Sequence, residues 1–202
     1  MTRKLFILPL ALLAGLAVQA QSVSVEKHTG YNIQTSEGFA GRIGQTFPEF
    51  EFTDLNGKVW KSKSLRGKVV YLNFWFTGCP PCIQEIPSIN AVYKHYINNP
   101  DVVMLSIDGF ESSDVIKSFL KKHPIDLPIS TIKMKELMTL AGNNGNIGFP
   151  THILIDRDWR LVIAASGGNS TIGESIQKDI ESILLSKSTP ALKTDEPPQT
   201  KK

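Results

Sequence analysis

The stretch Val69-Val70-Tyr71-Leu72-Asn73-Phe74-Trp75-Phe76-Thr77-Gly78-Cys79-Pro80-Pro81-Cys82 decides the fold of this chain. Its first part is almost continuously apolar, which is typical of a strand covered on both faces of a sheet. From Pro80 onward the apolar residues recur at helical spacing. Cys79 and Cys82 are the only two cysteines of the chain. They lie too close together to cross-link distant parts of a fold, but they can exchange a disulfide with another molecule.

The patterns around this stretch predict one α/β domain over residues 43–185. A strand, a helix and a second strand in succession predict a right-handed parallel crossover, and a tight turn at 156–158 predicts an antiparallel pair. The remaining expected elements are a hairpin over 47–60, a strand over 102–107, a helix starting at Ser112 or Ser113, a short helix over 134–140, strands over 151–155 and 160–165, and a helix over 171–185.

The N-terminal residues predict export of the chain, and the C-terminal residues predict a disordered tail. Arg3 and Lys4 precede an apolar run, and small residues end at Ala20, which is the layout of a cleavable secretory signal peptide over residues 1–20. The run is too short for a permanent span, which takes about 20 apolar residues. Residues 21–42 are interpreted as a lead-in segment. Residues 186–202 have few apolar side chains and are expected to be disordered.

The charge balance argues against two classes of partner. Loss of Arg3 and Lys4 with the signal peptide lowers the formal net charge from +3 to +1. A nearly neutral protein favours neither nucleic acid nor an anionic membrane surface as its partner. Export would place the chain in the periplasm, where disulfides persist, and we expect it to be a monomer.

Position in the helix distinguishes the two cysteines. Pro80 suits the first residue of a helix, where a missing N–H costs nothing, so Cys79 is expected at the N-cap. The positive end of the helix dipole lowers the pKa of a thiol there, and only the thiolate attacks disulfides. Cys82, one turn further, is expected to be better shielded and to resolve a mixed disulfide.

The two prolines predict the direction of the reaction. Neither Pro80 nor Pro81 offers an amide N–H, so within the first turn Cys82 is the earliest donor to the Cys79 thiolate. A less stabilised thiolate corresponds to a more reducing couple. The sequence therefore favours a disulfide reductase over an oxidant.

Two simpler interpretations of the cysteine pair remain open. A zinc site needs two more ligands, and the four histidines show no paired spacing; no metal is expected. A structural disulfide between Cys79 and Cys82 would close a very small loop and constrain the unfolded chain little.

The sequence also resembles a known family. Asn73 to Cys82, then Glu85 and Pro87, and later Gly148-Phe149-Pro150-Thr151 are similar to the TlpA/ResA-like periplasmic thioredoxins. The likeness covers residues 43–185. It implies a thioredoxin fold with an N-terminal β-hairpin extension and a helical insert before the strand that follows a cis-proline.

The resemblance implies roles for particular residues. Pro150 matches the cis-proline, and Phe149 before it would hold an extended substrate through its backbone. Glu85 matches a carboxylate that assists proton transfer, although a solvated helix glutamate is the alternative. Asn73 stands where cytoplasmic thioredoxins carry a buried aspartate. Trp75, Pro80 and Pro81 would complete the substrate rim.

Two positions depart from the family pattern. The family usually has an aromatic residue just before the first cysteine, where this chain has Gly78. Phe76 stands where a small residue is common. Both departures bear on the rim that meets the substrate, so they put substrate choice in question more than the chemistry.

The resemblance further implies a function. Cys79 and Cys82 would reduce disulfides of exported proteins, such as the cysteines of apocytochrome c, without a cofactor, and an upstream membrane donor would regenerate the dithiol. A peroxiredoxin-type thiol peroxidase is one alternative, although Phe76 and Leu72 occupy positions where peroxidases have Thr and Pro. A redox-inactive module that binds polypeptide is the other.

Overall fold

The computed structural model describes residues 34–35, 39, 41–141 and 147–186. The predicted signal peptide, most of the predicted lead-in segment and the predicted tail beyond Ser186 lie outside these residues. Within the described part, no helix is long and apolar enough to cross a membrane.

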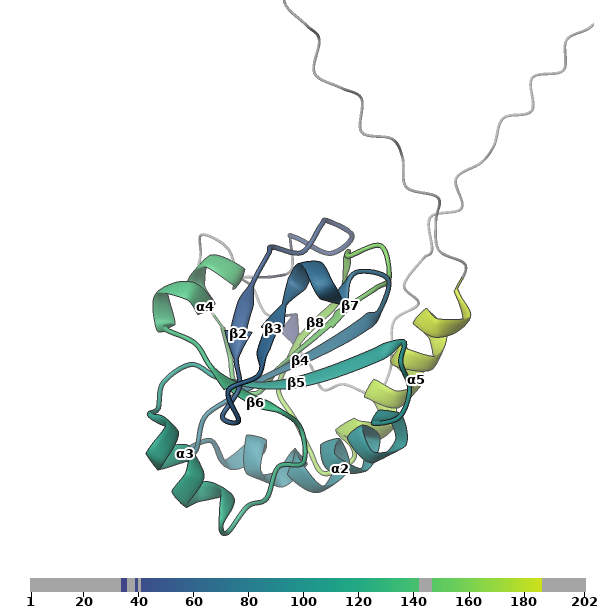
Figure 1. Ribbon diagram of the computed structural model, residues 1–202. Coiled ribbons are helices and arrows are strands. Elements are labelled where there is room, and N and C mark those ends of the chain that lie inside the picture. The colour runs from purple at the N-terminus through teal and green to yellow at the C-terminus, as the bar shows by residue number, and fades with distance from the viewer. Residues whose placement is uncertain (1–33, 36–38, 40, 142–146, 187–202) are drawn as a thin grey trace, which may run out of the picture.

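Six of the described strands form one sheet in the order β1-β8-β7-β4-β5-β6 (Figure 1). β4, β5 and β6 are parallel, whereas β7, β8 and β1 continue the sheet in antiparallel pairs. The strands are β1 (Gln34–Thr35), β4 (Val69–Trp75), β5 (Val102–Asp108), β6 (Ile129–Thr131), β7 (Thr151–Ile155) and β8 (Leu161–Ser166).

Helices and a separate hairpin cover the two faces of this sheet (Figure 1). The hairpin and α4 pack on one face, and α2 and α5 pack on the other. The elements are β2 (Glu51–Thr53), β3 (Val59–Lys61), the 3₁₀ helix η1 (Ser62–Leu65), α2 (Pro80–Tyr96), α3 (Ser113–Leu120), α4 (Met134–Ala141) and α5 (Ile172–Leu185). This is the thioredoxin fold, with the predicted hairpin extension and the predicted helical insert before β7.

The central strand β4 divides its side chains between the two layers. Val70, Leu72 and Phe74 enter the core beneath the hairpin and α4. Alternate side chains point to the other face, because successive residues of a strand point in opposite directions. There Tyr71 joins the core under α2 and α5, and Asn73 hydrogen-bonds to α2. The apolar run of β4 therefore hides a polar stripe that faces the C-x-x-C helix.

The sequence prediction missed two strands. β6 follows Pro128 and pairs with the end of β5, whereas the sequence suggested only a connecting segment there. β1 pairs with β8 through Gln34 and Thr35, inside the predicted lead-in. Phe39 is also buried in the core. The described sheet and its core therefore include residues that precede position 43.

The helix that begins with the C-x-x-C is positioned by a close crossing with α5. A Cβ atom at Gly173, in the first turn of α5, would lie 2.5 Å from the backbone carbonyl oxygen of Ser88 in α2. The Gly173 amide also donates to the Ser88 hydroxyl at 3.3 Å. Only glycine allows this approach of the two backbones.

Two carboxyl groups hold the turn between β4 and α2. Asp108, fully buried at the end of β5, accepts hydrogen bonds from the amides of Phe110 and Glu111 at 2.8 Å each. Glu111 in turn accepts from the Thr77 amide at 2.8 Å and from the Thr77 hydroxyl. The turn that leads to Cys79 is thus fixed to the end of β5.

Burial makes this pair sensitive to pH. It raises the pKa of Asp108 to about 6, and the neighbouring Glu111 carboxyl adds to the increase. Burial alone would also raise the pKa of Glu111, but hydrogen bonds with Asp108 and Thr77 outweigh it and lower that pKa. Near neutral pH the two carboxylates repel each other.

We expect Gly173→Ala to lower the free energy of unfolding by about 1–3 kcal/mol, because the added methyl group must push α5 away from the Ser88 backbone. Helix propensity alone predicts the opposite sign, since alanine is better than glycine in a helix. Urea denaturation gives the value. The matched control is Gly41→Ala, whose Cβ atom would have no neighbour within 4 Å. Equal effects of the two substitutions would contradict the close crossing.

We expect Asp108→Asn to flatten the pH dependence of stability. The carboxyl binds its proton more tightly in the folded protein than in the unfolded chain, because its pKa rises from 3.8 to about 6. Its contribution to the free energy of unfolding is therefore complete below pH 4 and is lost as pH rises through 6. Over this pH range the free energy of unfolding of the wild type should fall by about 1–3 kcal/mol. The variant should not show this decrease. Thermal melts from pH 4 to 7 measure this, with the exposed Asp114→Asn as control; parallel curves for wild type and Asp108→Asn would refute the assignment.

Candidate active site

The two cysteines form a disulfide at the start of α2. Cys79 is the N-cap residue, and its sulfur accepts a hydrogen bond from the Cys82 amide at 3.3 Å. The two intervening residues are prolines, so Cys82 is the earliest residue of the helix that can donate to this sulfur. The predicted N-cap position of Cys79 and its predicted donor are confirmed.

Exposure does not distinguish the two cysteines in this oxidised state. Each is 2% exposed, whereas Cys82 was expected to be the better shielded of the two. The neighbours Gly78 and Pro80 are exposed. The disulfide thus lies just beneath the surface, and the difference between the two sulfurs comes from their positions in the helix.

The peptide bond between Phe149 and Pro150 is cis, as the resemblance implied. Pro150 is buried, and its carbonyl oxygen accepts a hydrogen bond from the Gly167 amide at 2.8 Å. Phe149 is half-buried and packs against the hydrophobic cluster that contains both cysteines. The segment before β7 therefore lies beside the disulfide.

Glu85 is buried beneath this site. It is 2% exposed, and its Oε1 accepts a hydrogen bond from Asn73 Nδ2 at 2.8 Å. A Cβ atom at Gly168 would collide with Oε2 and would lie 2.9 Å from Pro150 Cγ. The carboxylate is thus enclosed between α2, β4 and the chain after β8, which rules out the alternative of a solvated helix glutamate.

A histidine and a tyrosine complete this buried polar group. His152 Nε2 lies 3.4 Å from Glu85 Oε2 and 3.2 Å from the carbonyl oxygen of Gly167. Because that carbonyl can only accept, Nε2 carries a hydrogen. Nδ1 lies 2.8 Å from the Tyr71 hydroxyl. Burial, together with the Glu85 charge, raises the pKa of Tyr71 well above its ordinary value, so its hydroxyl stays neutral and donates to Nδ1.

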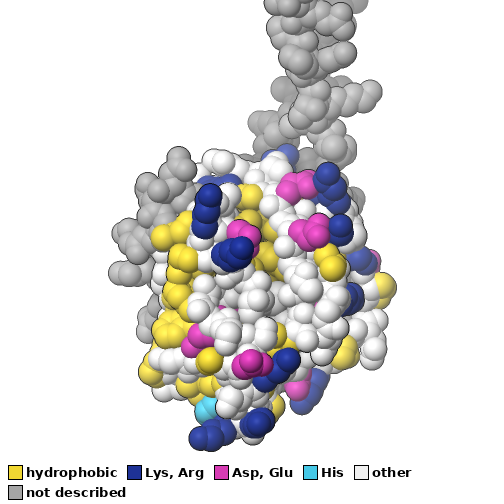
Figure 2. All heavy atoms as spheres, turned by 60° about the vertical axis from the view of Figure 1, so that its left-hand side comes forward, with side chains coloured by type: hydrophobic (Ala, Val, Ile, Leu, Met, Phe, Trp, Pro, Cys, Tyr) yellow, Lys and Arg dark blue, Asp and Glu magenta, His cyan; other side chains and the backbone are white. Residues whose placement is uncertain are grey.

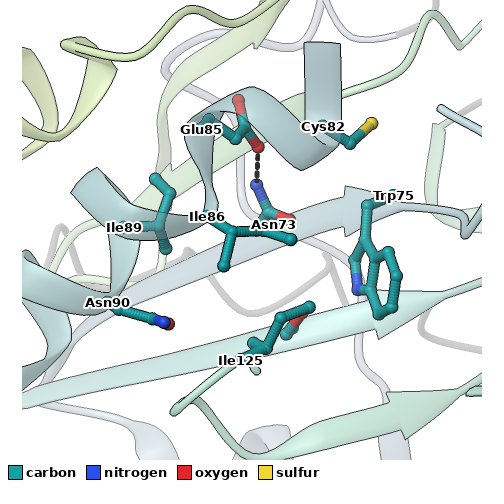
Figure 3. A pocket seen from close by; sticks show the side chains of 9 residues that line it. Asn73, Trp75, Cys82, Glu85, Ile86, Ile89, Asn90 and Ile125 are labelled. Atoms are coloured by element: carbon teal, nitrogen blue, oxygen red, sulfur yellow. Dashed lines mark hydrogen bonds between the residues drawn. The ribbon is translucent and has the colours of Figure 1, made fainter. Parts of the chain in front are cut away.

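A small cavity connects the polar group with Cys82 (Figure 3). Cys82 and Glu85 line it from α2, and Asn73 and Trp75 line it from β4. It has room for about one water molecule. The indole Nε1 of Trp75 is buried without a hydrogen-bond partner among the described residues, so the cavity offers a polar group that water can satisfy.

The structure places the remaining predicted residues as follows. Pro80 is exposed and Pro81 is half-buried, so both can contact another molecule. Trp75, expected at the rim, is only 2% exposed and packs on Phe119 at 5.3 Å between ring centroids. It supports the site from below, and its small exposed fraction leaves little surface for direct contact with a substrate.

Sequence reasoning missed two groups of polar residues: His152 with Tyr71, and Asp108 with Glu111. Tyr71 and Asn73 share one face of a strand, a spacing that could have indicated a polar stripe. His152 lies opposite Asn73 in the antiparallel pairing of β4 and β7, which the sequence does not reveal. In the described part of the chain, no group of three or more His, Cys, Asp or Glu side chains is arranged to hold a metal ion.

Comparisons with known proteins agree with this geometry. The thiol-disulfide oxidoreductase ResA of Bacillus thuringiensis (strain Al Hakam) is 34% identical over 143 residues, which cover 71% of this chain and 77% of that protein. The ResA protein of Geobacillus kaustophilus (strain HTA426) is 32% identical over 158 residues, covering 76% of this chain and 87% of that protein.

Solved structures show the same fold. A thiol:disulfide interchange protein of the thioredoxin family from Chlorobium tepidum TLS superposes with a TM-score of 0.60 at 27% identity, covering 69% of this chain and 95% of that one. The model of the AhpC/TSA family matches residues 43–163. The chain therefore belongs to the AhpC/TSA family, and it is a thiol–disulfide oxidoreductase similar to the ResA proteins.

Proposed function

We propose that this protein is an exported reductase of protein disulfides, with Cys79 as the nucleophile and Cys82 as the resolving thiol. The observation that carries this proposal is the position of the Cys79 sulfur, which caps a helix and lies beside the segment that contains the cis-proline. Pro80, Pro81, Phe149 and Pro150 border the substrate.

The reaction transfers two electrons from the reduced protein to the substrate. The Cys79 thiolate attacks one sulfur of the substrate disulfide, a mixed disulfide forms, and the other substrate sulfur leaves as a thiolate. The Cys82 thiolate then attacks the Cys79 sulfur and releases the second substrate sulfur. The product is the Cys79–Cys82 disulfide, and an upstream dithiol returns the two electrons.

Glu85 is the group that accepts the proton of Cys82 before the second step. Both residues line the same small cavity, and a water molecule there can pass the proton between them. Asn73 cannot take this role, because an amide does not titrate. The hydrogen bond from Asn73 instead holds the Glu85 carboxylate in place.

The first turn of α2 supports the reducing direction. The Cys82 amide is the donor to the Cys79 sulfur, and both residues between the cysteines lack an N–H. A thiolate with few donors is less stabilised, which lowers the reduction potential of the couple. The signal-like segment at residues 1–20 supports export to the periplasm, where apocytochrome c is a candidate substrate and a membrane protein is the candidate electron donor.

The proposal predicts the behaviour of two cysteine variants. Cys79→Ser should abolish the catalysed reduction of insulin by a dithiol, because the proposed nucleophile is removed and Cys82 is buried. Cys82→Ser should instead accumulate a mixed disulfide between Cys79 and its partner, visible as a band that reductant removes. Retention of full biological activity by Cys79→Ser, despite the loss of insulin reduction, would establish a redox-inactive binding module, and catalytic consumption of peroxide would establish a peroxidase.

A second prediction concerns Glu85. Glu85→Gln should slow the release of reduced substrate by about 100- to 10,000-fold, because a positioned general base contributes roughly this much. The first attack by Cys79 should change far less, so quenched-flow samples should contain more mixed disulfide than the wild type. The control is Glu174→Gln, at an exposed glutamate in the first turn of α5. An unchanged release rate in Glu85→Gln would remove this residue from the mechanism.

A further inference from the structure

Three phenylalanine rings meet beside the disulfide. The ring centroids of Phe76 and Phe110 are 5.5 Å apart, those of Phe76 and Phe149 are 5.4 Å apart, and those of Phe110 and Phe149 are 5.1 Å apart. All three pairs are edge-to-face, an arrangement that aromatic rings favour. We call these three residues the aromatic rim.

The aromatic rim joins three loops that are distant in sequence. Phe76 lies between β4 and Cys79, Phe110 follows β5, and Phe149 precedes Pro150. Phe76 and Phe149 pack inward against the cluster that contains both cysteines. Phe110 has its amide bound to the buried Asp108 carboxylate at 2.8 Å. Each ring is therefore held by an element of the site itself.

Gly78 makes room for this arrangement. A Cβ atom at Gly78 would lie 3.3 Å from Cε2 and 3.6 Å from Cδ2 of the Phe76 ring. A larger side chain would crowd the ring against its neighbours. The two unusual features of the segment before Cys79, a phenylalanine at 76 and a glycine at 78, are thus spatially linked.

The rim remains open to solvent at Phe110, which is 50% exposed. On the face that carries α3 and α4, Figure 2 shows hydrophobic side chains gathered along one side and charges of both signs elsewhere. A hollow begins at Phe110 and runs toward the start of α4, where Lys133 and Met134 line it. An exposed aromatic anchor beside a binding site is a typical recognition feature.

We propose that the aromatic rim selects the substrate polypeptide by binding an aromatic or large aliphatic side chain next to its disulfide-bonded cysteine. This inference rests on the proposed reductase function and adds a substrate class to it. Phe76 and Phe149 pack against the cluster that contains both cysteines, so a polypeptide whose disulfide reaches Cys79 lies close to the rim. The side chain beside the substrate cysteine then covers the exposed ring of Phe110.

The test compares two disulfide-bonded peptides that differ only in a phenylalanine or a serine next to one cysteine. Oxidised glutathione serves as a small disulfide without that side chain. The wild-type protein should reduce the phenylalanine peptide with about tenfold higher kcat/KM than the serine peptide, mainly through a lower KM. One aromatic contact provides about this much binding free energy. Equal kcat/KM values for the two peptides would overturn the inference without any variant. Failure to reduce any of the three disulfides would instead defeat the proposed function.

Variants then assign the preference to the rim. Phe110→Ser should reduce the peptide preference to about one, and Phe110→Leu should keep part of it. The matched control is Ile97→Ser, an exposed apolar residue at the far end of α2, which should retain the wild-type preference. An unchanged preference in Phe110→Ser, or equal losses with the peptide and with glutathione, would refute the assignment. The assignment would also be refuted if the wild type were a dimer that Phe110→Ser dissociates while the peptide preference persists. In that case a second copy of the chain would occupy the rim.

Discussion

The burial of one carboxylate constrains the whole site. Glu85 is enclosed under the disulfide, where an uncompensated charge costs several kcal/mol. Asn73 donates to Oε1, whereas Oε2 has no hydrogen-bond partner among the described residues and has His152 Nε2 at 3.4 Å. Tyr71 fixes the other nitrogen of the same imidazole. Three features enclose this one group: the polar stripe of β4, His152 in β7 and Gly168.

The sequence predicted the elements that carry a local signal. The apolar run of β4, the proline at the first position of α2 and the hairpin turn around Gly57 depend on neighbouring residues, and all three appear as expected. The pair Asp108 and Glu111 was missed for a different reason. Their contact with Thr77 depends on the parallel register that sets Trp75 beside Asp108. Register between strands is a tertiary property, and no local pattern in this chain encodes it.

The same limit applies to the residues around the disulfide. The aromatic rim gathers three phenylalanines that are 34 and 39 positions apart along the chain, at Phe76, Phe110 and Phe149. Each of them alone is an ordinary apolar residue near the end of a strand. Two of the unusual residues, Phe76 and Gly78, could be noticed in the sequence, but their effect on each other became clear only from the ring that lies over the glycine.

The two sides of the disulfide therefore carry different tasks. Below it, a closed polar group holds a carboxylate close to the resolving thiol. Beside it, apolar rings border the sulfur that reacts with other molecules. On the proposed mechanism, Cys82 attacks the Cys79 sulfur in line with the departing substrate sulfur. An electron donor that attacks the Cys79 sulfur of the disulfide follows the same line in reverse, so substrate and donor would approach Cys79 across the same surface. Both cysteines are 2% exposed in the disulfide state, so little of either sulfur is open to solvent. On the proposed mechanism, a rim that selects substrates by their apolar side chains would therefore impose the same requirement on the electron donor.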